Sequence, residues 1–138
     1  MEHPTDVQLI ANLVVRRPDG RVLFVRYHED DERWWLPGED LEPYEHPDDA
    51  ARRVLDETFP RLDISSTTFH DIESFRGRRG WHVVFNYDVS ADGDASSDVP
   101  TDWFDPSELP KTMHGPWERE VVRKVVDSTV SNPGPSSP

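Results

Sequence analysis

Cysteine is absent from this chain of 138 residues, lysine occurs only at Lys111 and Lys124, and no apolar run is long. The absence of cysteine excludes a disulfide framework and thiol chemistry. No stretch approaches the roughly 18 apolar residues of a membrane-spanning helix, and no charged-then-apolar signal peptide opens the sequence. We therefore expect a soluble protein that is located in the cytoplasm and has no membrane partner.

Positive charge is also scarce, because 28 acidic residues face 15 lysines and arginines and give a formal net charge of −13. An acidic surface repels the phosphate backbone, which excludes nonspecific binding to nucleic acid. The length suits a single domain with a substantial core. We expect this domain to span residues 1–130 and the polar residues 131–138 to form a disordered C-terminal tail.

The apolar pattern predicts two strand pairs. Strands are expected at residues 11–15, 22–25, 67–75 and 81–89. Pro18-Asp19-Gly20 joins the first pair, because proline presets one turn dihedral and glycine accepts a positive one. The second pair is joined through Arg76, Arg78 and Arg79, which suit either an exposed hairpin tip or an anion contact.

Two later segments carry helix signals. The segment from Asp105 to Glu108 has the spacing of a short N-capped turn with proline at its first position. A final helix is expected from Gly115-Pro116, where Trp117, Val121 and Val125 form an apolar stripe that would dock on the sheet. Asp98 lies in the polar loop at residues 91–100, and Asp102 lies just after it. Either residue is a candidate to contribute a carboxylate to a metal site.

Residues 47–58 predict a central helix. Pro47 suits the first helical position, where its missing N–H costs nothing, and two aspartates follow in the first turn. One helical face is suited to packing on a core and consists of Ala50, Ala51, Val54, Leu55 and Thr58. The other face carries Asp49, Arg53 and Glu57, each four residues from the next.

This charged face has two interpretations. It is either a solvated ladder of salt bridges, worth about 0.3–0.5 kcal/mol per pair, or part of a divalent-metal site. In the second interpretation the loop acids Glu42 and Glu45 join the helix acids Asp56 and Glu57, because hard cations prefer oxygen ligands. Spacing alone does not decide between them.

The stretch from Trp34 to Arg61 resembles the signature box of the Nudix family, hydrolases of nucleoside diphosphates linked to another moiety. That box runs Gly, five residues, Glu, seven residues, then Arg-Glu-apolar-any-Glu-Glu-any-Gly-apolar. Aligned without gaps, Glu45 takes the first glutamate position, Arg53 the arginine and Glu57 the first of the paired glutamates. Residues 103–110 are similar to a segment that follows the last core strand in this family. The resemblance implies an α/β fold, a Nudix-like α/β/α sandwich with a mixed β-sheet.

Several positions depart from the family box. Val54 and Thr58 stand at two of its glutamate positions. Family glycines are replaced by Glu39, Tyr44 and Pro60. A one-residue deletion after Leu55 would align Asp56-Glu57-Thr58 with the family's Glu-Glu-Thr, although it would rotate the rest of the helix by about 100°. Glu57 is retained in either register.

The resemblance implies a Nudix-type hydrolase that cleaves a phosphoanhydride in a nucleoside-diphosphate-linked substrate at an altered metal site. Mg²⁺ or Mn²⁺ would be weakly held, because such sites rely on few carboxylates plus substrate phosphates. The expected catalytic residues are Glu57, Arg53 and Glu45. The expected metal ligands are Glu57, Asp56 and Glu45. Substrate contacts are expected from Gly38, Arg26, Arg33 and Trp34.

Two alternatives stay open. A catalytically inactive Nudix-like domain would bind a nucleotide-like ligand or a protein partner. A Nudix-related isomerase of prenyl diphosphates is the weaker alternative, since its commonest form uses a cysteine and this chain has none. The expected partner is a small nucleotide-type molecule, and a homodimer is an assembly that the resemblance implies.

Overall fold

The computed structural model describes residues 7–27, 32–77, 80–113 and 116–131. Within these residues six strands form one sheet in the order β4-β5-β1-β2-β6, with β3 paired to β1. The strands are β1 (Val7–Arg16), β2 (Val22–Val25), β3 (Gly38–Asp40), β4 (Leu62–Gly77), β5 (Gly80–Gly93) and β6 (Thr101–Phe104). The helices are α1 (Pro47–Thr58), the short 3-10 helix η1 (Pro106–Glu108) and α2 (Pro116–Ser131).

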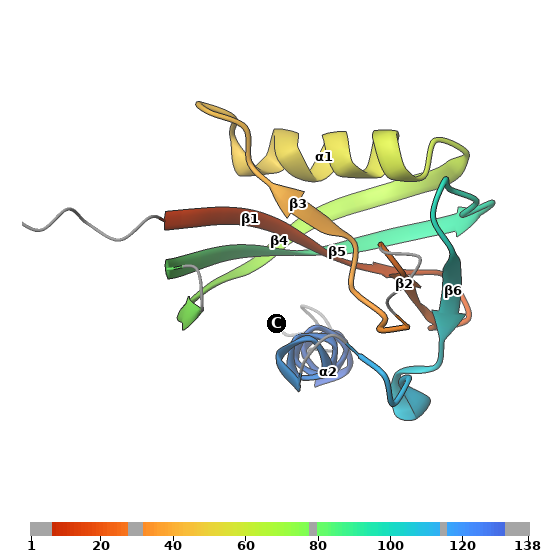
Figure 1. The fold of residues 1–138 in the computed structure, drawn as a ribbon. Helices are drawn as coiled ribbons and strands as arrows, with labels where there is room; N and C mark the ends of the chain where they lie inside the picture. The colour runs from red at the N-terminus through yellow and green to blue at the C-terminus, as the bar shows by residue number, and fades with distance from the viewer. Residues whose placement is uncertain (1–6, 28–31, 78–79, 114–115, 132–138) are drawn as a thin grey trace, which may run out of the picture.

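The layers of the molecule are visible in Figure 1, where α1 covers one face of the sheet and α2 the opposite face. β1 runs parallel to β5 and antiparallel to β2 and β3, so the sheet is mixed. This arrangement confirms the predicted α/β/α sandwich. Of the helices in the described ranges, none has the length and apolar character that a membrane crossing requires.

Each face of the sheet carries its own core. The core beneath α1 combines alternate strand residues with the apolar face of that helix: Leu13, Val15, Tyr87, Val89, Ala51, Val54 and Leu55. The core beneath α2 combines residues of the opposite strand faces with the helix stripe: Val14, Val22, Phe24, Val121, Val122 and Val125. Both cores confirm the apolar helix faces predicted from the 3.6-residue period.

The helix ends follow the sequence signals. His46 caps α1, because its Nδ1 accepts a hydrogen bond from Asp48 N at 3.0 Å. Asp105 caps η1, because its Oδ1 accepts from Ser107 N at 2.9 Å, as the capped-turn prediction requires. α2 begins at Pro116 and continues through Ser131, one residue into the predicted tail. The remaining tail, residues 132–138, lies outside the described residues.

The strands differ from the prediction in two ways. β1, β4 and β5 are longer than expected. The bounds of β4 do not follow from the pattern, because β4 lies at the sheet edge and its mostly exposed side chains do not alternate clearly. The short strands β3 and β6 were not predicted. Strands of three and four residues carry too little pattern to be recognised, and pairing with β1 and β2 specifies them instead.

Candidate functional site

β3 brings the segment before α1 close to the centre of the sheet. A Cβ atom at Gly38 would lie 2.7 Å from the Ala11 carbonyl oxygen, so this approach requires glycine. The Tyr27 hydroxyl holds Gly38 in place, since Gly38 N donates to Tyr27 Oη at 2.9 Å and Tyr27 Oη donates to Gly38 O at 3.2 Å. Burial raises the pKa of Tyr27 to about 12, which keeps the hydroxyl protonated.

A buried carboxylate fixes the residues just before Gly38. Glu118 on α2 is 2% exposed, and its Oε2 accepts a hydrogen bond from Leu36 N at 2.5 Å. The sequence prediction assigned no role to Glu118. A signal was nevertheless present, because Glu118 is spaced with Val121, Val122 and Val125 and is therefore an acid on the apolar face of its helix.

Arg53 is the centre of a polar cluster beside α1. Its Nε donates to Glu45 Oε2 at 2.9 Å, and its Nη2 donates to Glu45 Oε1 at 3.0 Å. The same Nη2 donates to Asp40 O at 3.0 Å, and Glu42 N donates to Glu45 Oε1 at 2.8 Å. The guanidinium lowers the pKa of the Glu45 carboxyl, and Glu45 in turn raises the pKa of Arg53. This bidentate pair, which we call the Arg53 clamp, joins the helix to the loop before it.

Two further carboxylates lie next to the clamp. Glu57 Oε1 is 3.7 Å and Glu39 Oε1 is 3.8 Å from the same atom, Arg53 Nη1. The Glu57 side chain is 62% exposed, so its carboxylate also reaches solvent. Glu39 lies opposite Ala11 in the β1–β3 pairing and therefore on the sheet face that α1 covers. Its substitution for a box glycine was noted in the sequence, but its contact with Arg53 was not predicted.

The two positions that the gap-free alignment assigns to box glutamates, Val54 and Thr58, have different surroundings. Val54 is 0% exposed and belongs to the core beneath α1. Thr58, one helical turn later, is half-buried. A carboxylate at position 54 would therefore point into an apolar core, whereas one at position 58 would lie near solvent.

A small cavity lies at the C-terminal end of α1. It has a volume of about 190 Å³ and is lined by Glu57, Thr58, Pro60, Arg61, Ser96, Ser97 and Asp98. Arg61 Nη1 donates to Ser96 Oγ at 3.2 Å, which links the helix end to the loop after β5. The cavity thus brings Glu57, the loop carboxylate Asp98 and an arginine together. Asp102 lies on β6 and is not among its lining residues.

These donors suit a divalent cation that is held by few protein ligands. In the described part of the chain, no group of three or more histidine, aspartate or glutamate side chains is placed to hold a metal ion. Both oxygens of Glu45 accept hydrogen bonds from Arg53. Glu57 and Asp98 offer hard oxygen ligands in one cavity, and Mg²⁺ commonly combines one or two carboxylates with water and substrate phosphates.

The other predicted site residues lie elsewhere. Asp56 is exposed and does not line the small cavity. Trp34 packs against the core beneath α2, and the Arg26 guanidinium lies 5.7 Å from the centre of its ring. Arg33 is exposed. The structure therefore brings Arg53, Glu45 and Glu57 together, whereas Arg26 and Trp34 meet on the opposite face of the sheet. Of the predicted basic patch, positions 78 and 79 lie outside the described residues.

Comparison with known proteins gives a consistent result. A family model described as NUDIX domain matches residues 7–125. The fold is similar to that of a MutT NUDIX hydrolase from Burkholderia pseudomallei, with a TM-score of 0.72 and 18% identity over 87% of this chain and 98% of that one. A MutT protein from Methanosarcina mazei Go1 gives a TM-score of 0.73 and 16% identity over 93% and 97% of the two chains. A C. elegans Ap4A hydrolase in a binary complex gives a TM-score of 0.66 and 16% identity over 88% of this chain and 98% of that one. Comparison with curated protein sequences finds no match.

Proposed function

The chain belongs to the NUDIX family, and we propose that it hydrolyses a phosphoanhydride bond in a nucleoside-diphosphate-linked substrate at an altered metal site. One observation carries this proposal: Glu57 lies beside the Arg53 clamp and also lines a cavity with Asp98 and Arg61. This arrangement offers hard ligands for a cation and a positive charge for a phosphate in the same place. The proposed substrates are small nucleotide-type molecules, and the proposed location is the cytoplasm.

Glu57 is the principal ligand in this proposal, and Asp98 is the second carboxylate that would hold Mg²⁺ or Mn²⁺. A bound divalent cation polarises phosphate oxygens and makes its water more acidic. Arg61 neutralises charge on the phosphate, because a guanidinium matches phosphate geometry. Arg53 orients Glu57, and Glu45 acts through Arg53 by fixing the position of its guanidinium. Glu39 brings a further carboxylate to Arg53 Nη1 in a chain that lacks the glutamate at position 54.

A second candidate function is binding without catalysis. Val54 lies in the core where the family box has a glutamate, and Thr58 replaces another. A domain that lost two carboxylates can keep a nucleotide-binding surface while losing the cation affinity that hydrolysis needs. Under this alternative the molecule recognises a nucleotide-like ligand or a protein partner.

The two functions are separated by a turnover assay with matched variants. The purified protein is incubated with millimolar Mg²⁺ or Mn²⁺ and with nucleotide sugars, nucleoside triphosphates and dinucleotides, including Ap4A, while phosphate release is measured. We expect hydrolysis that falls by about 100-fold or more in Glu57→Gln, because its carboxylate would be a direct ligand. The control is Asp56→Asn, which removes the neighbouring exposed carboxylate and should change the rate less than about threefold.

Three outcomes contradict parts of this assignment. Equal rates for wild type and Glu57→Gln would show that the site lies elsewhere. Losses of similar size in Asp56→Asn and Glu57→Gln would favour the shifted register, in which these two residues take the positions of the paired glutamates. Thermal stabilisation by a nucleotide without turnover of any substrate would support the binding domain instead of the hydrolase.

A further inference from the structure

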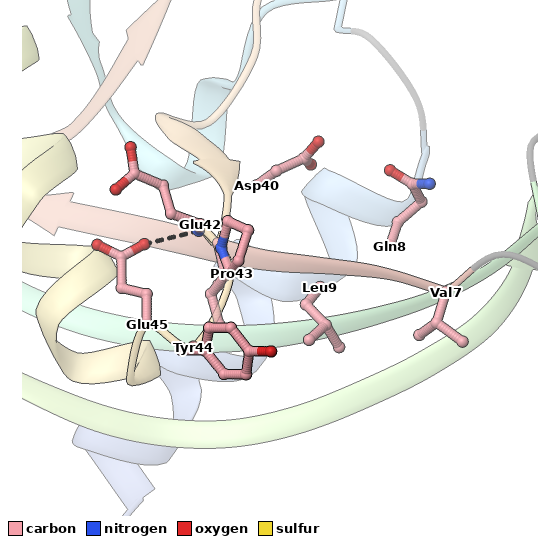
Figure 2. Close-up of a pocket in the computed structure, with 9 residues that line it drawn as sticks. Val7, Gln8, Leu9, Asp40, Glu42, Pro43, Tyr44 and Glu45 are labelled. Carbon is pink, nitrogen blue, oxygen red and sulfur yellow. Dashed lines mark hydrogen bonds between the residues drawn. The ribbon is translucent and has the colours of Figure 1, made fainter.

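A second and larger pocket lies beside the loop that connects β3 and α1. Its volume is about 340 Å³, and it is lined by Val7, Gln8, Leu9, Asp40, Leu41, Glu42, Pro43, Tyr44 and Glu45. Figure 2 shows Tyr44, Leu9 and Val7 on one side of β1, whereas Gln8 and Asp40 point to the other side. The volume is at the small end of the range for ligand-binding pockets.

Tyr44 is the unusual residue of this pocket. Its φ angle is 66°, in the left-handed region where a side chain is sterically costly, and its side chain is fully exposed. Glycine would adopt this backbone without strain. The tyrosine therefore keeps an unfavourable conformation without burying its ring in the protein. Such strain is concentrated at ligand-binding sites, where the side chain is kept for its contacts with a ligand.

The floor of the pocket is apolar and uncovered. Val7 is 45% exposed and Leu9 is 41% exposed, although both belong to the sheet face that α1 covers further along β1. The parallel pairing of β1 with β5 places Trp81 beside Val7 on this face, and Trp81 is 52% exposed. An apolar surface with exposed aromatic rings suits a flat ring system that can stack.

The rim of the pocket is acidic. Glu42 contributes a carboxylate and the Glu45 oxygens are held by Arg53, whereas Asp40 pairs with Ile10 and points to the other side of β1. Carboxylates repel phosphate and accept hydrogen bonds from N–H groups. The rim thus excludes the phosphates of a nucleotide from this pocket but suits a ring that carries amino groups. A second copy of the chain is also disfavoured here, because a symmetric contact would bring the same acidic rim against itself.

We propose that this pocket, which we call the Tyr44 pocket, binds the nucleobase of the substrate by stacking against Tyr44 and over Leu9. This inference rests on the proposed function, since it names the part of the substrate that lies outside the phosphate site. Glu45 connects the two sites, because it lines the pocket and also holds Arg53, which lies beside Glu57. The Tyr44 pocket lies before the first turn of α1 and the small cavity lies at its last turn, so a substrate that occupies both extends along the helix over roughly 18 Å.

The test uses free nucleosides, which lack phosphate and therefore do not depend on the metal site. Binding of adenosine, guanosine, cytidine and uridine to the full chain is measured by NMR titration for wild type, Tyr44→Gly and Tyr44→Phe. We expect at least one nucleoside to bind wild type and its affinity to fall about tenfold in Tyr44→Gly, because base–aromatic stacking is lost. Tyr44→Phe retains the ring and should bind as wild type does.

Stability and kinetics complete the test. Tyr44→Gly should melt at the same temperature as wild type or higher, because the strained backbone is relieved, so weaker binding cannot be attributed to misfolding. With a hydrolysed substrate, Tyr44→Gly should raise KM about tenfold and leave kcat unchanged. Sedimentation of both proteins checks for a change in assembly.

Each possible result is informative. The proposal is overturned if no nucleoside binds at millimolar concentration, if Tyr44→Gly binds as wild type does, or if Tyr44→Gly converts a dimer to a monomer. Hydrolysis with an unchanged KM in Tyr44→Gly would contradict the Tyr44 pocket but not the hydrolase. Nucleoside binding that depends on Tyr44, without any turnover, would support the pocket and contradict the hydrolase.

Discussion

The two faces of α1 differ in the surroundings that they give to the positions of the family box. The outward face retains the arginine and one glutamate of the box, and both lie in a polar cluster with Glu45 and Glu39. On the inward face, Val54, which the gap-free alignment with the box places at a glutamate position, is completely buried. The outward face positions the Glu57 carboxylate near solvent, whereas the inward face is core. The two positions that the alignment assigns to box glutamates are therefore not equivalent, since only position 58 lies near solvent.

The largest expected effect comes from placing a glutamate at the buried position 54. Val54→Glu places a carboxylate among Leu13, Tyr87 and other core residues, where it has neither water nor a counter-charge. We expect the free energy of unfolding to fall by about 3–5 kcal/mol, because an unpaired charge is costly to bury. Urea denaturation followed by circular dichroism measures this loss, and hydrolysis should not increase.

The matched control places a glutamate at position 58. Thr58→Glu introduces the same side chain at a half-buried position that lines the small cavity with Glu57. Its cost in stability should be about 1 kcal/mol or less. Magnesium affinity, measured by calorimetry, should rise about tenfold, because a third carboxylate joins the site. Equal destabilisation by the two substitutions would refute the contrast between the faces, as would a gain of activity in Val54→Glu alone.

The sequence predicted the parts of this contrast that depend on local periodicity. The helical spacing assigned Val54 and Leu55 to the apolar face, and the structure confirms that assignment. The cap of η1 and the start of α2 were also predictable, because proline and capping residues act on their neighbours in the chain. The layers of the fold followed from the resemblance of the box, which covers only part of the chain.

Contacts between distant residues could not be predicted in this way. Glu118 binds Leu36 across 82 positions, and no spacing rule links two such residues. The loop that carries Asp98 meets the end of α1 only because β5 returns it to that side of the sheet. Arg26 and Trp34 stay predicted substrate contacts, and the structure places them together on the α2 side, a position that the sequence did not indicate. Residue type and spacing do not determine which face of a sheet a loop residue reaches.

An intermediate effect is expected from weakening the Arg53 clamp. Arg53→Lys keeps the positive charge. A lysine cannot make the two parallel hydrogen bonds to Glu45 together with the hydrogen bond to Asp40 O, as the guanidinium does. We expect kcat/KM to fall about 10- to 100-fold, because Arg53 acts as a positioning residue for Glu57. Magnesium affinity should fall in parallel, which separates this role from a loss of substrate contacts.

The control for the clamp is the neighbouring arginine. Arg52 is exposed on α1, and Arg52→Lys makes the same chemical change one residue away. We expect its activity and magnesium affinity to stay within about twofold of wild type. If Arg52→Lys and Arg53→Lys behave alike, the clamp has no special role and the outward face is a solvated ladder of charges.

The smallest expected effect concerns the acid sensitivity of the same clamp. The Arg53 guanidinium lowers the pKa of Glu45 in the folded state, so the unfolded chain takes up a proton on Glu45 before the folded chain does. The contribution of this group to stability is therefore complete above the ordinary glutamate pKa of about 4.5 and is lost as the pH falls through the lower folded value. Glu45→Gln should be less stable than wild type near neutral pH, and the difference should shrink as the pH falls from about 5 to about 3.

Glu42→Gln removes a neighbouring exposed carboxylate that does not hold Arg53 and should leave the pH profile of wild type unchanged. Denaturation midpoints across this range would contradict the clamp if Glu45→Gln followed the wild-type curve at every pH, because the pair would then contribute nothing that protonation can remove.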